Sequence, residues 1–240
     1  MISNGIMRII KKVFSKINEL WVKRSPESYI AYLRKKGISI GENVILRPRQ
    51  CEIDLTRPSL VSIGNNVYMN KNFTLLTHDF VSGVFINLYD DFLPSSGQVT
   101  IGNNVRFGIN CTVLKDVTIG DNCFIGACSL VTKDIPPNSI AAGVPAKVIC
   151  SISEYYERRK EECIKEALLY AKSINNRYNR EPRPEDFWEE FPLFVDINNI
   201  DNFPEIPIKK QLGKSYINWL SNHKALYKSF EEFIKASKNL

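Results

Sequence analysis

Residues 99–131, VTIGNNVRFGINCTVLKDVTIGDNCFIGACSLV, repeat a pattern of apolar and turn residues every six positions. One phase of the repeat is apolar throughout, and the phase four positions later is apolar or small. The first phase comprises Ile101, Phe107, Val113, Ile119, Ile125 and Val131; the second comprises Val105, Cys111, Val117, Cys123, Ser129 and Ile135. A helical period near 3.6 and strict strand alternation both fail to give this pattern, whereas a parallel β-helix repeats every six residues.

The six-residue period also predicts which side chains stack. Three hexads form one coil of a three-sided prism, so residues eighteen apart lie over one another at a spacing of about 4.8 Å. The predicted stacked pairs are Ile101 with Ile119, Phe107 with Ile125, and Val113 with Val131. Gly and Asn fit the corners because they tolerate left-handed backbone angles. Residues 40–44 and 63–67 carry the same pattern and extend the prism towards the N-terminus.

The sequence predicts three regions. They are an N-terminal helical segment over residues 1–37, a β-helix over residues 38–150 and an α-helical region over residues 151–240. The hexad pattern is lost between residues 80 and 98, so we expect a loop extruded from the prism there. Loops held by a rigid scaffold often carry function.

Helical spacing and capping residues place the helices outside the prism. Ser25 as the N-cap, Pro26 in the first turn and Gly37 as the terminator predict a helix that reaches Lys36. In the C-terminal region we expect helices over residues 153–175, 185–191 and 215–238.

Composition is that of an ordinary soluble protein, with 44% hydrophobic and 24% charged residues. No apolar run is long enough to cross a bilayer, and no cleavable signal is recognisable, so we expect a cytoplasmic protein. Among six cysteines, Cys111 and Cys123 occupy inward positions of the repeat. We read them as reduced core residues rather than nucleophiles.

The net charge of +6 is concentrated near the N-terminus. The basic residues there are Arg8, Lys11, Lys12, Lys16, Lys23 and Arg24, and apolar residues interleave with them at helical spacing. Such a helix suits the surface of an anionic membrane, at the inner face of the cell membrane in this case. The alternative, a helix that packs its apolar stripe on the protein, is the more common use of this pattern.

Two histidines limit the chemistry that the chain offers. His78 stands where the repeat stops, at the base of the predicted loop, which suits a general base. Taken alone, such a histidine is more often structural. His223 lies in a polar stretch, and we interpret it as a solvated surface residue.

Residues 99–149 strongly resemble the hexapeptide-repeat acyltransferases, most of all the galactoside, maltose and nodulation-type O-acetyltransferases and those that modify capsule or O-antigen sugars. The segment VTKDIPPNSIAAGVPAKVI, residues 131–149, is the most specific part. The resemblance covers about residues 38–150. It implies a left-handed β-helix, a homotrimer with active sites between subunits, and acetyl-CoA as co-substrate without a metal.

The same resemblance implies roles for individual residues. His78 matches the family's catalytic base, and the residues that match the coenzyme path are Gly108, Ile109, Ala127, Thr132, Lys133 and Lys147. The main chain around Gly108 is our candidate donor to the tetrahedral oxyanion. The group that orients the ring of His78 cannot be identified from the sequence.

The acceptor is expected to be a carbohydrate rather than a nucleic acid. Arg106 replaces an aromatic residue found in several relatives and is a candidate acceptor contact, as are Asp79 and Tyr89 beside or within the loop. The alternative is that the loop only covers a neighbouring subunit.

We therefore expect an O-acetyltransferase that modifies a sugar hydroxyl of a cell-surface polysaccharide or its precursor. Drug-modifying acetyltransferases and amino-sugar N-acyltransferases are the alternatives within this fold. The large N-terminal helical domain of serine O-acetyltransferases is not recognisable. A zinc carbonic anhydrase needs three histidine ligands, and a non-catalytic scaffold would not require His78 at the loop base.

Overall fold

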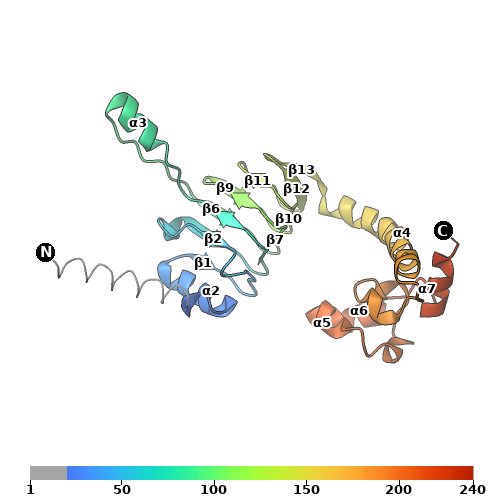
Figure 1. The fold of residues 1–240 in the computed structure, drawn as a ribbon. Helices are drawn as coiled ribbons and strands as arrows, with labels where there is room; N and C mark the ends of the chain where they lie inside the picture. Colours follow the sequence, from blue (N-terminus) through green and yellow to red (C-terminus); the bar gives the residue numbers. More distant parts are fainter. Residues whose placement is uncertain (1–20, 240) are drawn as a thin grey trace, which may run out of the picture. The chain divides into compact units, whose positions relative to one another are not determined.

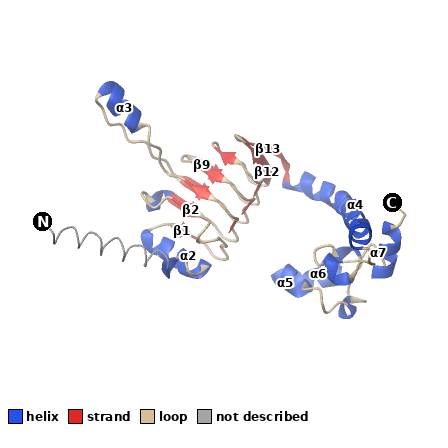
Figure 2. Ribbon diagram, viewed as in Figure 1, coloured by secondary structure: helices blue, strands red, loops and turns tan. Residues whose placement is uncertain are grey.

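The computed structural model describes residues 21–239, which fall into two compact units divided between Tyr155 and Tyr156. The first unit contains the strands, and the second is helical (Figures 1 and 2). The basic N-terminal helix expected from the sequence falls almost wholly on residues 1–20 and so lies outside the described residues.

The strands of the first unit form three sheets, in which every pair of strands except β12 with β13 is parallel. The first sheet contains β1 (Ser39–Ile40), β3 (Val61–Ile63), β6 (Val99–Ile101) and β9 (Val117–Ile119). The second contains β4 (Tyr68–Met69), β7 (Arg106–Phe107), β10 (Phe124–Ile125), β12 (Ser139–Gly143) and β13 (Ala146–Ser151). The third contains β2 (Glu52–Ile53), β5 (Thr74–Leu75), β8 (Thr112–Val113) and β11 (Leu130–Val131).

The chain visits these sheets in rotation, which produces the coils of a parallel β-helix. After β3 it enters β4 in the second sheet and β5 in the third, and β6 returns it to the first (Figure 1). The predicted register is confirmed, because Ile101 pairs with Ile119, Phe107 with Ile125 and Val113 with Val131. These side chains are all at most 1% exposed and form the core of the prism.

Asparagines hold the corners in left-handed backbone conformations. Asn104 and Asn122 have φ angles of 54° and 58°. The amide of Asn104 donates to the side chain of Asn122 at 2.9 Å, and Asn122 donates to Asn138 at 2.9 Å. The corner residues therefore supply both the turn and a hydrogen-bonded ladder outside the core.

The last turn of the repeat departs from the prism. β12 and β13 pair antiparallel, so residues 139–151 form a hairpin that closes the end of the prism. The β-helix expected to continue to residue 150 therefore ends in an antiparallel hairpin. The turn between the two strands contains Gly143 at φ 103°, a left-handed angle that favours glycine, and the bond before Pro145 is cis.

Helix α2 (Pro26–Lys36) covers the start of the prism and confirms the predicted cap residues. Ser25 accepts a hydrogen bond from the N–H of Ser28, and Gly37 adopts a left-handed φ of 107°. Tyr29, Ile30 and Leu33 are buried from this helix. The helix therefore packs an apolar stripe against the first coils.

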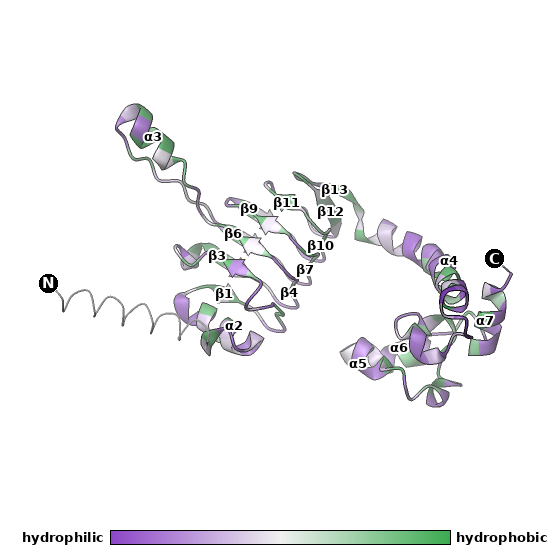
Figure 3. Cartoon of the chain, in the orientation of Figure 1, coloured by the Kyte–Doolittle hydropathy of each residue, from purple (hydrophilic) through white to green (hydrophobic). Residues whose placement is uncertain are grey.

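The extruded loop leaves the prism between β5 and β6 and contains helix α3 (Ser82–Tyr89), which the sequence pattern did not reveal (Figure 1). None of its residues is buried, although hydrophobic residues run along it (Figure 3).

The second unit has its own aromatic core. Its elements are most of α4 (Ile152–Tyr178), then η2 (Pro184–Phe187), η3 (Phe191–Leu193), η4 (Ile200–Asn202), α5 (Ile208–Leu212), η5 (Gly213–Ser215), α6 (Tyr216–Asn222) and α7 (Phe230–Ser237). The long helix expected over residues 153–175 is present. The helix expected over 185–191 is two 3₁₀ turns, and that expected over 215–238 is interrupted by residues 223–229. Within residues 21–239 no helix combines the length and hydrophobicity needed to span a bilayer.

Candidate active site

His78 is paired with an aspartate from the coil below it. Nδ1 of His78 lies 2.6 Å from Oδ2 of Asp54. Asp54 also accepts hydrogen bonds from the N–H and hydroxyl of Thr77 at the same oxygen. Its other oxygen accepts bonds from the N–H and hydroxyl of Thr56, at 2.8 and 2.7 Å. The carboxylate is thus fixed at both oxygens.

Two inserted corners bring the pair together. In a regular coil four positions separate Val113 from Val117, but eight separate Ile53 from Val61 two coils below. Residues 54–60 therefore bulge from the prism and carry Asp54 at their start. The loop that follows His78 leaves from the same edge. Both His78 and Asp54 therefore lie where the six-residue repeat is broken, and their corners do not follow the regular stacking geometry.

The surroundings of Asp54 favour its ionised form. Burial by itself raises the pKa of a carboxyl group, and Asp54 is only 8% exposed. Hydrogen bonds from Thr77, Thr56 and His78 outweigh burial and hold the pKa of Asp54 well below its usual range. The carboxylate is accordingly a permanent acceptor at neutral pH.

An ionised Asp54 determines the tautomer of His78. Since a carboxylate can only accept, Nδ1 must carry the proton of the bond between them. The hydroxyl of Thr56 lies 3.2 Å from Nδ1 but donates to Asp54. Among residues 21–239, Nε2 of His78 has no hydrogen-bond partner. Its lone pair is therefore available to accept a proton from a ligand.

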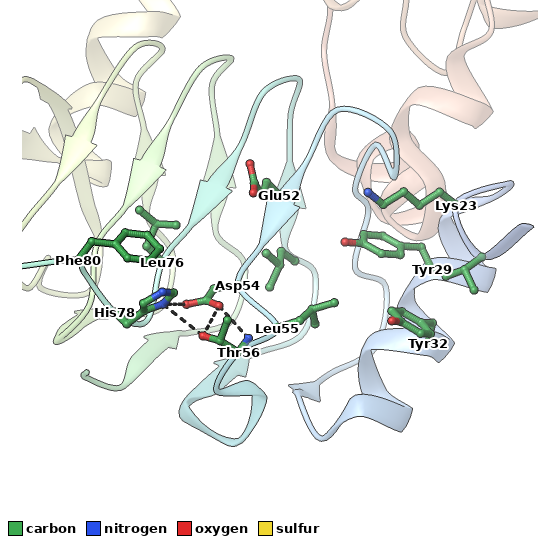
Figure 4. A pocket seen from close by; sticks show the side chains of 12 residues that line it. Lys23, Tyr29, Tyr32, Glu52, Asp54, Leu55, Thr56, Leu76, His78 and Phe80 are labelled. Carbon is green, nitrogen blue, oxygen red and sulfur yellow. Dashed lines mark hydrogen bonds and ion pairs between the residues drawn. The ribbon is translucent and has the colours of Figure 1, made fainter. Parts of the chain in front are cut away.

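His78 opens into a cavity of about 530 Å³. Phe80 and Leu76 line it beside the histidine, and its far side is formed by Tyr29, Tyr32 and Lys23, as Figure 4 shows. The rings of Phe80 and His78 lie edge to face, with centroids 5.1 Å apart. The aromatic walls of this cavity, the carboxylate of Glu52 and the amine of Lys23 suit a small polar ligand.

The expected acceptor contacts are not gathered in this cavity. Asp79 does not line it; its carboxylate binds Ser95 at 2.8 Å and Lys115 at 3.4 Å and holds the neck of the loop. Tyr89 ends α3 and is 70% exposed. Arg106 lies on the second sheet, where its guanidinium faces the ring of Tyr68 at 5.7 Å. In a single chain, these three residues therefore do not form one site with His78.

Four of the residues expected to bind the coenzyme flank strands of the third sheet, and Lys147 lies on the second sheet. Ile109 and Ala127 are exposed at the corners that lead into β8 and β11. Thr132 and exposed Lys133 follow β11 at the opposite edge, which is also the edge of His78. Lys147 is exposed on β13.

The packing of neighbouring coils requires glycine at position 108. A Cβ atom there would lie 2.5 Å from the N atom of Ala127, so the close stacking of coils excludes any side chain. Its N–H donates to the carbonyl of Ile125 at 2.8 Å. The N–H of Gly108 itself is thus engaged within the prism, and an oxyanion donor in the main chain around it would be a neighbouring group.

Of the other expectations for individual residues, that for the cysteines is confirmed and that for His223 is not. Cys111 and Cys123 are buried, and burial raises the pKa of both thiols, which confirms them as core residues. His223 is half-buried and not a fully solvated surface residue: its ring stacks on Trp219 at 4.2 Å, and Nε2 lies 2.7 Å from the carbonyl of Pro192. No group of three His, Cys, Asp or Glu side chains with metal-binding geometry occurs within the described part of the chain.

Asp54, Thr56 and Thr77 were missed by the sequence analysis. The signal that could have found Asp54 is the second break in the repeat. Cys51–Ile53 fit the inward pattern, and the next inward residue, Val61, comes four positions late. Asp54 starts one inserted corner and His78 starts another, one coil away. An acid and a histidine in such positions are a candidate pair.

Residues 98–133 match the family model described as bacterial transferase hexapeptide (six repeats). The chain is 40% identical over 149 residues to galactoside O-acetyltransferase of Escherichia coli K12, covering 61% of this chain and 68% of that protein. It is 35% identical over 156 residues to Protein CapG of Staphylococcus aureus, covering 61% and 90%. A solved galactoside acetyltransferase in complex with coenzyme A aligns with a TM-score of 0.40 at 27% identity, covering 61% of this chain and 83% of that one.

Proposed function

This chain belongs to the hexapeptide-repeat acetyltransferases, and we propose that it is an acetyl-CoA-dependent O-acetyltransferase acting on a sugar hydroxyl of a cell-surface polysaccharide or its precursor. The observation that carries the proposal is the pair formed by His78 and Asp54. It leaves one ring nitrogen of a polarised imidazole facing a cavity of ligand size.

In the proposed reaction His78 acts as the general base. Nε2 takes the proton of the acceptor hydroxyl as its oxygen attacks the thioester carbonyl. The new C–O bond forms, the C–S bond breaks, and the imidazolium returns its proton to the departing thiolate. Asp54 stabilises the transient positive charge of the ring by accepting from Nδ1. No bond between enzyme and acetyl group is needed.

The outer surface of the last coils suits the coenzyme. Exposed Ile109 and Ala127 offer apolar contacts without charge, which fits a pantetheine chain. Lys133 and Lys147 are exposed and fit the nucleotide phosphates by charge. The coenzyme would thus lie beside the third sheet, with its thiol end towards the edge that carries His78. The oxyanion donor must be a group other than the N–H of Gly108.

We further propose a left-handed prism and a homotrimer with active sites between subunits. Support comes from the loop: Val84, Leu88 and Phe92 are each more than half exposed, and α3 buries none of its residues. Apolar surface of this kind marks an interaction site. A neighbouring prism would cover it and add a wall to the cavity of His78. Sedimentation should then give three times the chain mass of 27.5 kDa.

A carbohydrate acceptor is supported by the galactoside O-acetyltransferase relative and by the aromatic and carboxylate lining of the cavity. Tyr32 and Phe80 offer faces for a sugar ring, and Glu52 can accept from hydroxyl groups. Because the donor is a cytoplasmic metabolite, we place the reaction in the cytoplasm.

The test is an acetyl-transfer screen read by release of the coenzyme thiol. Sugars, sugar nucleotides, capsule oligosaccharides, amino sugars, serine and antibiotics are offered to the wild type and to His78→Ala. We expect transfer to a carbohydrate, lost in the variant, with a product that mild alkali cleaves as an ester. A product stable to alkali would indicate an amide and favour the N-acyltransferase alternative, and transfer only to an antibiotic would contradict the proposal.

A further inference from the structure

A concentration of positive charge lies at the N-terminal end of the prism. A cavity of about 350 Å³ there is lined by the four basic residues Lys23, Arg24, Arg47 and Arg49. Its other described lining residues are Ser25, Pro26, Leu46, Pro48 and Gln50, so no carboxylate contributes to this wall. Such a surface attracts an anion that carries more than one charge.

This basic cavity is connected to the pocket of His78 by shared residues. A middle cavity of about 510 Å³ shares Lys23, Arg49 and Gln50 with it. The middle cavity also shares Lys23 and Glu52 with the histidine pocket. Figure 4 shows Lys23 at the end of that pocket opposite Phe80. One ligand can therefore occupy the histidine pocket with one end and the basic cavity with the other.

Arg47 and Arg49 lie on a corner that departs from the six-residue repeat. Eight positions separate Ile45 from Ile53, whereas seven separate their partners Tyr68 and Leu75. The extra residue lies in the turn over residues 47–50. There the N–H groups of Gln50 and Cys51 both donate to the carbonyl of Arg47 at 2.9 Å. The turn is therefore internally hydrogen-bonded and places the exposed side chains of Arg47 and Arg49 at one corner of the prism.

The charges of Arg47 and Arg49 are not neutralised by the described part of the chain. No Asp or Glu side chain within residues 21–239 forms an ion pair with either arginine. Guanidinium groups match the geometry of phosphate oxygens and bind them with two hydrogen bonds at once. The lysines expected to hold the coenzyme phosphates, Lys133 and Lys147, belong to the other end of the prism. The basic cavity is therefore left for a different anion.

We propose that the acceptor is a sugar phosphate, whose sugar lies at His78 and whose phosphate binds Arg47 and Arg49. Glu52, between the two, accepts from sugar hydroxyls and disfavours an anion at the catalytic end. This inference rests on the proposed function and adds the chemical class of its acceptor. The phosphate can belong to a monophosphate or to a nucleoside or lipid diphosphate, and the experiment distinguishes these sources.

The experiment compares Arg47→Gln/Arg49→Gln with wild type and with a matched control. The control, Lys35→Gln/Lys224→Gln, removes the same charge at exposed positions that line none of the three cavities. Glucose, galactose and N-acetylglucosamine are each offered as free sugar, 1-phosphate and uridine diphosphate ester. Calorimetry on the His78→Ala background measures binding of the same compounds without turnover.

We expect the wild type and the control to favour a phosphorylated form by about tenfold or more in kcat/KM. The arginine double variant should lose this preference through a higher KM for that form. Its kcat/KM for the free sugar and its KM for acetyl-CoA should stay unchanged. The preferred phosphorylated form then identifies the source of the phosphate.

Equal use of free and phosphorylated sugars by the wild type would overturn the inference and leave the proposed function intact. The inference would also be overturned if the arginine double variant lost activity towards free and phosphorylated sugars equally, or if its KM rose for acetyl-CoA instead. Arginine-dependent calorimetric binding without acetylation of any sugar would support the phosphate site and contradict the proposed function. Absence of both binding and transfer would overturn the two together.

Discussion

Oδ2 of Asp54 lies 2.6 Å from Nδ1 of His78, although the two residues are 24 positions apart. The bond crosses from one coil of the prism to the next, and four further hydrogen bonds from Thr56 and Thr77 hold the carboxylate. The rigid stack of coils therefore supports the orientation of the imidazole. We consider Asp54 a positioning residue, since it contacts His78 and would not touch the reacting atoms.

Replacing Asp54 with Asn should slow transfer without weakening coenzyme binding. The amide has nearly the same shape but can donate to Nδ1, which would stabilise the wrong tautomer and place the proton on Nε2. We expect kcat to fall by about 10²–10⁴-fold, with KM for acetyl-CoA within about twofold of wild type. Steady-state kinetics across pH 6–9 measure both. A purely structural role is indicated instead if kcat is retained while the melting temperature falls.

Replacing His78 with Ala should abolish most transfer because the base is lost. We expect a decrease of several orders of magnitude in turnover, about 10²–10⁴-fold, with near-normal affinity for coenzyme A. His223→Ala is the matched control, since it removes the chain's other histidine. That change should weaken the second unit, where His223 stacks on Trp219, and leave transfer intact. Equal activity of wild type and His78→Ala would remove the histidine from the mechanism.

The depressed pKa of Asp54 should appear as acid sensitivity of the first unit. A carboxyl group whose folded pKa is lowered stabilises the fold above its unfolded pKa, near about 4, and this contribution is lost as pH falls towards the folded value. We therefore expect wild type to unfold at a higher temperature than Asp54→Asn between pH 5 and 7. The difference should shrink below about pH 4. Calorimetric melting from pH 3 to 7 tests this, and a constant difference over the whole range would contradict it.

Most of the prism could be predicted from the sequence because its order is periodic. The stacking of Phe107 on Ile125 follows directly from an interval of eighteen residues. The dyad was missed because the corner inserted at residues 54–60 lengthens this interval, so that Asp54 meets His78 across 24 positions and not eighteen. Helix α3 was hidden for a related reason: it buries no residue, so it has no polar and apolar faces to produce a helical pattern.

Removing the charges of Lys133 and Lys147 together should weaken binding of the coenzyme. Both side chains are exposed at the end of the prism expected to hold the nucleotide. We expect Lys133→Ala/Lys147→Ala to raise KM for acetyl-CoA by about tenfold, with kcat at saturation unchanged. The difference should decrease at high ionic strength, because exposed charges are screened. An unchanged KM would show that these lysines are solvated surface residues.

Substituting Gly108 should test whether coil spacing, rather than ligand contact, requires glycine there. The Cβ of an alanine would meet backbone atoms of Ala127 at 2.5 and 2.7 Å, and backbone cannot move aside as a flexible side chain can. We expect Gly108→Ala to destabilise the first unit by about 1–3 kcal/mol. Gly83→Ala is the matched control, because nothing lies within 4 Å of its Cβ position and alanine favours the helix around it. Thermal unfolding of the two variants measures the effect. If Gly108→Ala melts like the wild type but binds acetyl-CoA poorly, its glycine serves the coenzyme and not the stacking of the coils.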